Sequence, residues 1–210
     1  MNKLIITADD YGMSPLFNRG IEELANRGIV TGTPVMIKRK YLTSKGHLKL
    51  CVPLGLHLEF KAGDAPTETE HQIRQFQKRF GQLPAYLDGH LHQHLVDPHF
   101  PEVIQAAQKF RLPVRSRQEQ DRRLLKKHGI RTPENFISWH PDRLEILTER
   151  MSHSTHYTLS ELVVHPGYTD PQCTYPYNEK REEELTFLNS PQFQALMAQF
   201  VLSSYRELTE

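Results

Sequence analysis

The chain has 210 residues, of which 38% are hydrophobic and 24% are charged, and its formal net charge is +1. This length suits one domain with a substantial core, so we expect a single domain over residues 1–210. The 26 basic residues are spread along the chain, which argues against a nucleic-acid surface. We interpret the locally basic stretch 111–127 as a solvated helix face with its connecting loop.

No segment approaches the ~20 apolar residues that span a membrane, so we expect no membrane partner. The opening apolar run, 4–8, is too short for a signal peptide. Cys51 and Cys173 form no Cys-x-x-Cys pair, which fits a reducing compartment. These features together predict a cytoplasmic protein.

Short apolar runs alternate with helical patterns along the chain. The predicted strands are 4–8, 30–37, 52–60, 86–90, 112–115, 162–165 and 200–205. The predicted helices begin at Ser14-Pro15, Thr67 and Asp97-Pro98, and two more cover 179–188 and 191–199. Segment 119–158 contains two helical patterns, and we assign no strand in it. The alternation predicts an α/β fold with a parallel sheet and helical crossovers.

Polar side chains gather where the predicted strands end. They are Asp9, Asp10, His57, His90 and His165. Barrel and open α/β enzymes build their sites at this edge of the sheet. We therefore expect the five residues to lie close together.

Asp9 and Asp10 are adjacent carboxylates at a strand end, so one can bind a metal while the other acts on water. A polar turn is the alternative, since aspartate is common at strand ends. His57, between two leucines, is a candidate ligand or else a satisfied core histidine. Gly55 favours a site because a missing side chain lets another group approach closely.

The stretch from Asp88 to His94 carries three histidines at alternate positions. His90, His92 and His94 would share one face if the strand continued, but we expect it to end near His90. Asp88 then either supports a ligand or faces the substrate. His165 precedes Pro-Gly, a stiff turn that suits a positioned acid or base, although a plain turn histidine is the alternative.

Mixed Asp/His ligation suits a divalent ion such as Zn²⁺, with Mg²⁺ and other divalent ions left open. Three protein ligands leave open coordination positions, as in a catalytic site. We therefore expect one divalent metal ion as the cofactor.

Five short motifs together resemble the YdjC-like family, also called the chitooligosaccharide deacetylase family. In chain order they are Ala-Asp-Asp-Tyr-Gly, Arg-Gly-Ile-Val-Thr, Gly-Leu-His-Leu, Leu-Asp-Gly-His-Leu-His-Gln-His and His-Pro-Gly-Tyr. Each is weak alone, but five in order are specific, and segment 204–208 is similar to the family's ending. Tyr11 stands where Phe is usual and Gly89 where Ser is usual. The chain is also shorter than most members, with losses after His57 and between Arg117 and Leu159.

The resemblance implies a (β/α) barrel-like fold, a distorted or incomplete TIM-type barrel. It also implies a metal bound by the second aspartate and two histidines, here Asp10, His57 and His90. Asp9 falls on the position of the general base and His165 on that of the catalytic acid. Three further residues are assigned to substrate binding: Arg115, Asp88 and Tyr168.

The expected function is removal of acetyl groups from an N-acetylated sugar or oligosaccharide. Asp9 would take a proton from the attacking water, and His165 would protonate the departing amine. The alternatives are hydrolysis of another amide or an ester at the same site, and a catalytically silent metal- or sugar-binding homologue. The sugar, the native metal and the oligomeric state are left open, a homodimer included.

Overall fold

The computed structural model describes residues 2–42 and 51–209. Its strands, all paired in parallel, are Lys3–Ala8 (β1), Thr33–Val35 (β2), Leu54–Leu58 (β3), Leu87–Gly89 (β4), Asn135–Ser138 (β5), Leu159–Val164 (β6) and Val201–Ser203 (β7). They form one sheet in the order β5-β6-β1-β7 and a second in the order β2-β3-β4. The predicted α/β fold with parallel pairing is confirmed.

Isolated bridges connect the two sheets. Thr7 of β1 pairs with Gly32 just before β2, and Leu87 of β4 pairs with Val114. The backbone N–H of Val114 donates to the carbonyl of Arg131, a few residues before β5. This succession is consistent with a barrel-like arrangement. The described residues contain seven strands in two sheets, and an eight-stranded TIM barrel is not confirmed.

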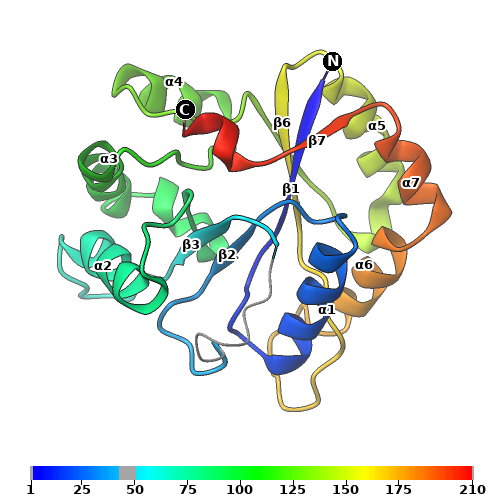
Figure 1. Ribbon diagram of the computed structural model, residues 1–210, viewed down its shortest axis with the longest axis horizontal. Coiled ribbons are helices and arrows are strands. Elements are labelled where there is room, and N and C mark those ends of the chain that lie inside the picture. Colours follow the sequence, from blue (N-terminus) through cyan, green and yellow to red (C-terminus); the bar gives the residue numbers. More distant parts are fainter. Residues whose placement is uncertain (1, 43–50, 210) are drawn as a thin grey trace.

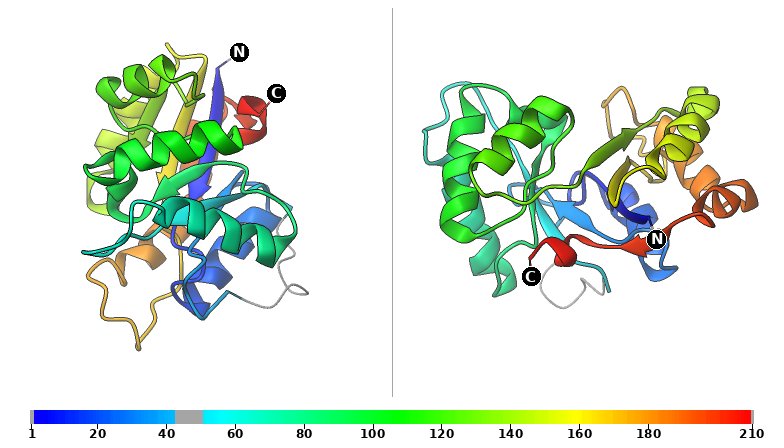
Figure 2. Two further views of the ribbon diagram at one scale, coloured as in Figure 1. Left: turned by 90° about the vertical axis from the view of Figure 1, so that its left-hand side faces the viewer. Right: turned by 90° about the horizontal axis from the view of Figure 1, so that it is seen from above.

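The helices lie outside the strands, with α2, α3 and α4 beside β2 and β3, and α1, α5, α6 and α7 on the other side (Figures 1 and 2). The α-helices are Pro15–Asn26 (α1), Glu68–Phe80 (α2), His99–Phe110 (α3), Glu119–Lys127 (α4), Leu144–Ser154 (α5), Lys180–Leu188 (α6) and Pro191–Met197 (α7). Short 3-10 helices are His90–Leu95 (η1), Pro141–Arg143 (η2) and Tyr205–Leu208 (η3). Within the described ranges, none of these helices has the length and apolar character to cross a membrane.

The helix ends follow the local sequence signals. Ser14 accepts a hydrogen bond from the N–H of Leu16, and Pro15 occupies the first position of α1. Gly81 ends α2 with a φ of 75°, in the left-handed region that glycine enters without a steric penalty. The predicted start of α1 at Ser14-Pro15 is thus confirmed, and α2 ends at a glycine.

Some predicted strands are shorter than expected, and one was missed. The range 30–37 contains only the three residues of β2, and 112–115 contributes only the bridge at Val114. Strand β5 lies in segment 119–158, where no strand was assigned. The strand at 86–90 ends at Gly89, because Leu91 and His92 adopt left-handed φ angles of 52° and 57°.

Gly55 is needed for packing rather than for a ligand. A Cβ at this position would lie 2.4 Å from the ring carbon Cζ of Tyr86. The Tyr86 ring in turn stacks on Tyr205 at a centroid distance of 3.8 Å, in a small buried cluster with Ile5 and Leu159. The group that approaches Gly55 is thus an aromatic side chain of the core.

The prediction that residues 1–210 form a single domain stays a prediction, and positions 1, 43–50 and 210 lie outside the described residues.

Candidate metal centre

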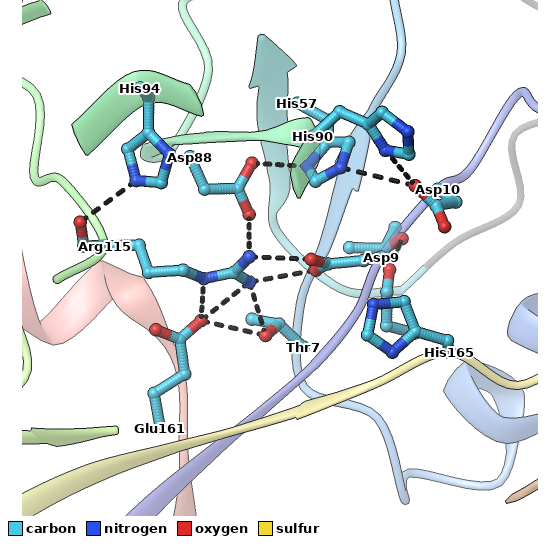
Figure 3. Close-up of polar contacts among 12 residues, drawn as sticks. Thr7, Asp9, Asp10, His57, Asp88, His90, His94, Arg115, Glu161 and His165 are labelled. Atoms are coloured by element: carbon cyan, nitrogen blue, oxygen red, sulfur yellow. Dashed lines mark hydrogen bonds and ion pairs between the residues drawn. The ribbon is translucent and has the colours of Figure 1, made fainter. Parts of the chain in front are cut away.

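Two carboxylates leave the end of β1 in different directions (Figure 3). Asp10 has a φ of 68°, which is uncommon for a residue other than glycine. The backbone turn after β1 sends Asp9 towards Arg115 and Asp10 towards His57 and His90. Adjacent aspartates therefore enter different surroundings, as the sequence suggested.

Asp10, His57 and His90 meet at one point. The Oδ1 atom of Asp10 lies 3.3 Å from Nε2 of His57 and 3.0 Å from Nδ1 of His90. Metal–ligand bonds of about 2.0–2.2 Å place neighbouring ligand atoms roughly 3–3.5 Å apart. The three residues come from the ends of β1, β3 and β4, and their ligand atoms form a group of the size that holds a metal ion.

Asp88 fixes the orientation of the His57 ring. Nδ1 of His57 donates to Oδ1 of Asp88 at 2.8 Å, which leaves Nε2 directed at Asp10. Burial disfavours the charged imidazolium, but Asp88 and Asp10 outweigh it and raise the pKa of His57 to about 10. Without a cation, His57 therefore carries a proton that a metal ion would displace.

Asp9 is held by Arg115 through two hydrogen bonds. Nη1 of Arg115 lies 2.7 Å from Oδ2 of Asp9, and Nη2 lies 2.9 Å from Oδ1. Burial favours the neutral acid, but Arg115 and His57 outweigh it and lower the pKa of Asp9 to about 2. Asp9 is ionised at neutral pH and can accept a proton there, although its basicity is reduced by the arginine.

Arg115 is a completely buried hub beneath the site. Besides Asp9, its guanidinium contacts Asp88 at 2.8 Å, Glu161 at 2.9 Å and the hydroxyl of Thr7 at 2.8 Å. Its exposed fraction is 0%, so it lies behind the centre and orients carboxylates. Substrate contact by Arg115 stays a prediction that these contacts do not support.

Asp88 and Tyr168, the other residues assigned to substrate binding, are both held by charged partners. Asp88 is fully buried between His57 and Arg115. The hydroxyl of Tyr168 donates to Glu23 of α1 at 2.7 Å, and Arg19 covers its ring. Their roles in substrate binding stay predictions, and the observed contacts support structural roles for both.

His92 and His94 do not join the ligand group. Nε2 of His94 donates to the carbonyl of Arg115 at 3.2 Å. Burial and Arg115 lower the pKa of His92 to about 3, so it is neutral. The left-handed turn at Leu91 and His92 explains why three histidines at alternate positions do not share one face.

His165 follows β6 and lies near Asp9 (Figure 3). Its backbone N–H donates to Oε2 of Glu184 at 2.6 Å, and its ring Nδ1 lies 4.0 Å from Oε1 of the same carboxylate. Tyr177 donates its hydroxyl to Glu184 as well. The His165 side chain remains 34% exposed, so it is both restrained and accessible.

Two buried charged residues of α6, Arg181 and Glu184, were not predicted from the sequence. Arg181 forms an ion pair with Oδ2 of Asp10. Both residues are 0% exposed, at positions that share one helix face with Leu185 and Leu188. Charged residues on the apolar stripe of an amphipathic helix were the signal that could have indicated them.

The charges of the cluster fit a divalent cation. Four buried carboxylates face two buried guanidinium groups, so two negative charges are uncompensated once His57 gives up its proton to act as a ligand; these groups are Asp9, Asp10, Asp88, Glu161, Arg115 and Arg181. Buried charge is costly unless it is paired or coordinated to a metal. Imidazole and carboxylate are also the donors that divalent transition ions prefer. Both the donor types and the charge excess therefore fit one divalent ion at Asp10, His57 and His90.

A cavity of 380 Å³ opens beside His90. Tyr41 and Tyr175 contribute aromatic rings to its lining, and the Tyr175 ring lies 5.9 Å from that of His90. This volume falls within the range of small-molecule sites. The cavity thus gives a molecule from solvent access to the candidate ligand group. Its aromatic rings offer a surface on which that molecule can stack.

Solved structures share the fold. A protein from Enterococcus faecalis described as a cellobiose-phosphate cleavage protein superposes with a TM-score of 0.86 at 23% identity, covering 100% of this chain and 99% of its own. The Xyl-CE4 domain of a multidomain xylanase from the hindgut metagenome of Trinervitermes trinervoides gives 0.56 at 11% identity, covering 99% and 89%. At these identities the similarity shows the fold alone.

Sequence comparison identifies the family. A carbohydrate deacetylase of Halalkalibacterium halodurans is 31% identical over 64% of this chain and 67% of its own length. The carbohydrate deacetylase of Thermoanaerobacter pseudethanolicus is 28% identical over 90% and 91%, and the chitooligosaccharide deacetylase of Yersinia pestis is 25% identical over 93% and 94%. The profile of the family described as YdjC-like protein matches residues 3–67 and 61–199. The chain therefore belongs to the YdjC-like family.

Proposed function

We propose that this chain is a metal-dependent hydrolase that removes acetyl groups from an N-acetylated sugar or oligosaccharide. The observation that carries the proposal is the convergence of Asp10, His57 and His90, with Asp9 and His165 beside them. The relatives named carbohydrate deacetylase and chitooligosaccharide deacetylase support the choice of substrate. A divalent ion at this group, such as Zn²⁺ or Mg²⁺, would supply Lewis-acid polarisation of the acetyl carbonyl and of water.

Two residues of the chain would move protons. Asp9, ionised and fixed by Arg115, accepts the proton of the attacking water. His165, which Glu184 restrains and which remains accessible, donates a proton to the amine nitrogen as the C–N bond breaks. Such acid–base assistance typically contributes about 10²–10⁴-fold to the rate. The products are acetate and the free amino sugar.

The substrate would enter through the cavity beside His90. Tyr41 and Tyr175 line it and offer aromatic faces to a sugar ring. Since the cavity borders a ligand of the centre, a sugar held there could direct its acetamido group at Asp9. We assign substrate binding to this opening rather than to the buried Arg115.

The test is release of acetate from N-acetylated chitooligosaccharides by the metal-free protein and after addition of Zn²⁺, Mg²⁺, Mn²⁺ or Co²⁺. Activity that appears only with a divalent ion is expected. Hydrolysis of acetyl esters without any release from N-acetyl sugars would replace the amide substrate with an ester. Metal binding without turnover on either class would identify a silent homologue.

The two neighbouring aspartates give a matched pair of variants. Asp9→Asn removes the proton acceptor and should lower kcat by about 10²–10⁴-fold while bound metal, measured by elemental analysis, stays near the wild-type level. Asp10→Asn removes a ligand and should lower the metal content as well. Equal metal content in the two variants would contradict the assigned roles.

A further inference from the structure

Arg181 is a fully buried cation directly behind a proposed metal ligand. It lies in the first turn of α6, its exposed fraction is 0%, and its Nη2 contacts Oδ2 of Asp10. Within the described residues, the Nε and Nη1 atoms have no hydrogen-bond partner. A buried guanidinium with unsatisfied donors is costly, which makes Arg181 a candidate for a role at the site besides packing.

The guanidinium is fixed from several sides. It stacks on the Phe17 ring of α1 at 4.1 Å. The backbone carbonyl of Arg181 accepts the N–H of Gly167, two residues after His165. One turn further along the same helix, Glu184 holds His165. Helix α6 therefore anchors Arg181 in the same frame as the proposed acid.

The two oxygens of Asp10 have separate partners. Oδ1 faces His57 and His90, and Oδ2 faces Arg181. A carboxylate that gives one oxygen to a fixed arginine has only the other oxygen free for a metal ion. Partners behind a ligand in this way orient it and tune its strength.

We propose that Arg181 is a positioning residue that restricts Asp10 to ligation through one oxygen and thereby keeps coordination positions open for water and substrate. The purpose of this positioning rests on the proposed function. The metal binding that tests it is measured without substrate. The cost of the positioning is electrostatic, because a fixed positive charge near the ion weakens metal binding. Arg181 would therefore lower the affinity of the site for the metal ion but preserve the open coordination positions that a hydrolase needs.

The test uses Arg181→Met, which removes the charge and the donors but keeps a long apolar side chain over Phe17. The dissociation constant for Co²⁺ should fall by about tenfold, since one repelling charge is lost. The visible Co²⁺ bands should lose molar absorptivity as Asp10 binds through both oxygens, because absorptivity falls as ligands are added. Acetate release per bound metal should fall by roughly 10–100-fold.

Two further variants complete the comparison. Arg181→Lys keeps the charge without the planar fork and should return the Co²⁺ dissociation constant towards the wild-type value. Arg19→Met, an exposed arginine that stacks on Tyr168 and does not contact Asp10, should change neither the affinity nor the spectrum. Thermal melts establish that each variant is folded.

A merely structural role predicts that the Co²⁺ dissociation constant rises or stays the same in Arg181→Met. A higher or unchanged Co²⁺ dissociation constant in Arg181→Met, with an unchanged spectrum in folded protein, would overturn the proposal. Because the spectrum and the affinity are measured without substrate, they decide on Arg181 even if the wild-type protein releases no acetate. Failure of the proposed function and failure of this inference are therefore distinguishable.

Discussion

Single side chains at this centre are held by partners that lie behind them. His57 is oriented by Asp88, Asp9 by Arg115, Asp10 by Arg181 and His165 by Glu184. Each supporting group is 0% exposed. A supporting charge that is withdrawn from water has a stronger electrostatic effect on the group that it orients.

His165 is expected to matter for amide hydrolysis and far less for hydrolysis of an activated ester. An amine leaves only when it is protonated, whereas an activated phenol leaves without an acid. His165→Ala should therefore lower kcat/KM on an N-acetyl sugar by about 10²–10⁴-fold, and far less on 4-nitrophenyl acetate. Metal content and melting temperature should stay near wild type, because a third of this side chain is exposed. Equal losses on the two substrates would leave His165 as a binding or structural residue.

The elements of the first half follow their sequence signals closely, because those signals are local. The Ser14-Pro15 start of α1 and the Gly81 end of α2 depend on a few neighbouring residues. Strand β5 is four residues long and is defined by pairing with β6, some twenty residues later in the chain. No local pattern carries that information, so the sequence of this segment does not predict the strand.

The candidate site likewise contains contacts that the sequence predicts and contacts that only the folded chain brings about. Motif order predicted the meeting of Asp10, His57 and His90, because parallel strands deliver their ends to one edge. Arg181 lies 171 residues from Asp10, and only the folded α6 brings the two together. Arg115 was expected near the substrate, and its complete burial reflects pairing with three carboxylates that no spacing reveals.

Helix α1 closely approaches the loop after β6 at Gly20. A Cβ at Gly20 would lie 2.7 Å from Cα of Gly167, which is backbone and cannot move aside cheaply. Gly20→Ala should therefore lower the free energy of unfolding by about 1–3 kcal/mol in urea denaturation, although alanine is the better helix former. Asn26→Ala, at an exposed position of the same helix, serves as the control. A stabilised Gly20→Ala protein would contradict the contact.

The proposed metal ligands come from both sheets of the molecule. Asp10 follows β1 of the first sheet, whereas His57 and His90 lie at the ends of β3 and β4 of the second. A bound cation would therefore connect the two sheets where isolated bridges otherwise join them. Loss of the cation should therefore lower the stability of the whole fold and not only disturb the site.

Removal of the metal should accordingly lower the melting temperature. A ligand at 100 times its dissociation constant stabilises the folded state by about 2.7 kcal/mol. For a chain of this size that corresponds to roughly 5–11 °C. The measurement compares thermal melts with EDTA and with excess Zn²⁺ or Mn²⁺. His57→Ala should show no such difference, and a shift of equal size in that variant would place the ion elsewhere.

Strand β1 pairs along its length with β6 and at its start with β7. Thr7 and Glu161, whose side chains bond across β1 and β6, are 154 residues apart. At a synthesis rate of about 5–20 residues per second, the ribosome needs roughly 8–30 s after making β1 to reach this part of β6. Throughout that interval β1, with its apolar residues Leu4, Ile5 and Ile6, lacks the partner of the backbone edge that later pairs with β6. The order of synthesis thus makes the nascent chain, more than the folded protein, the form exposed to aggregation and dependent on chaperones.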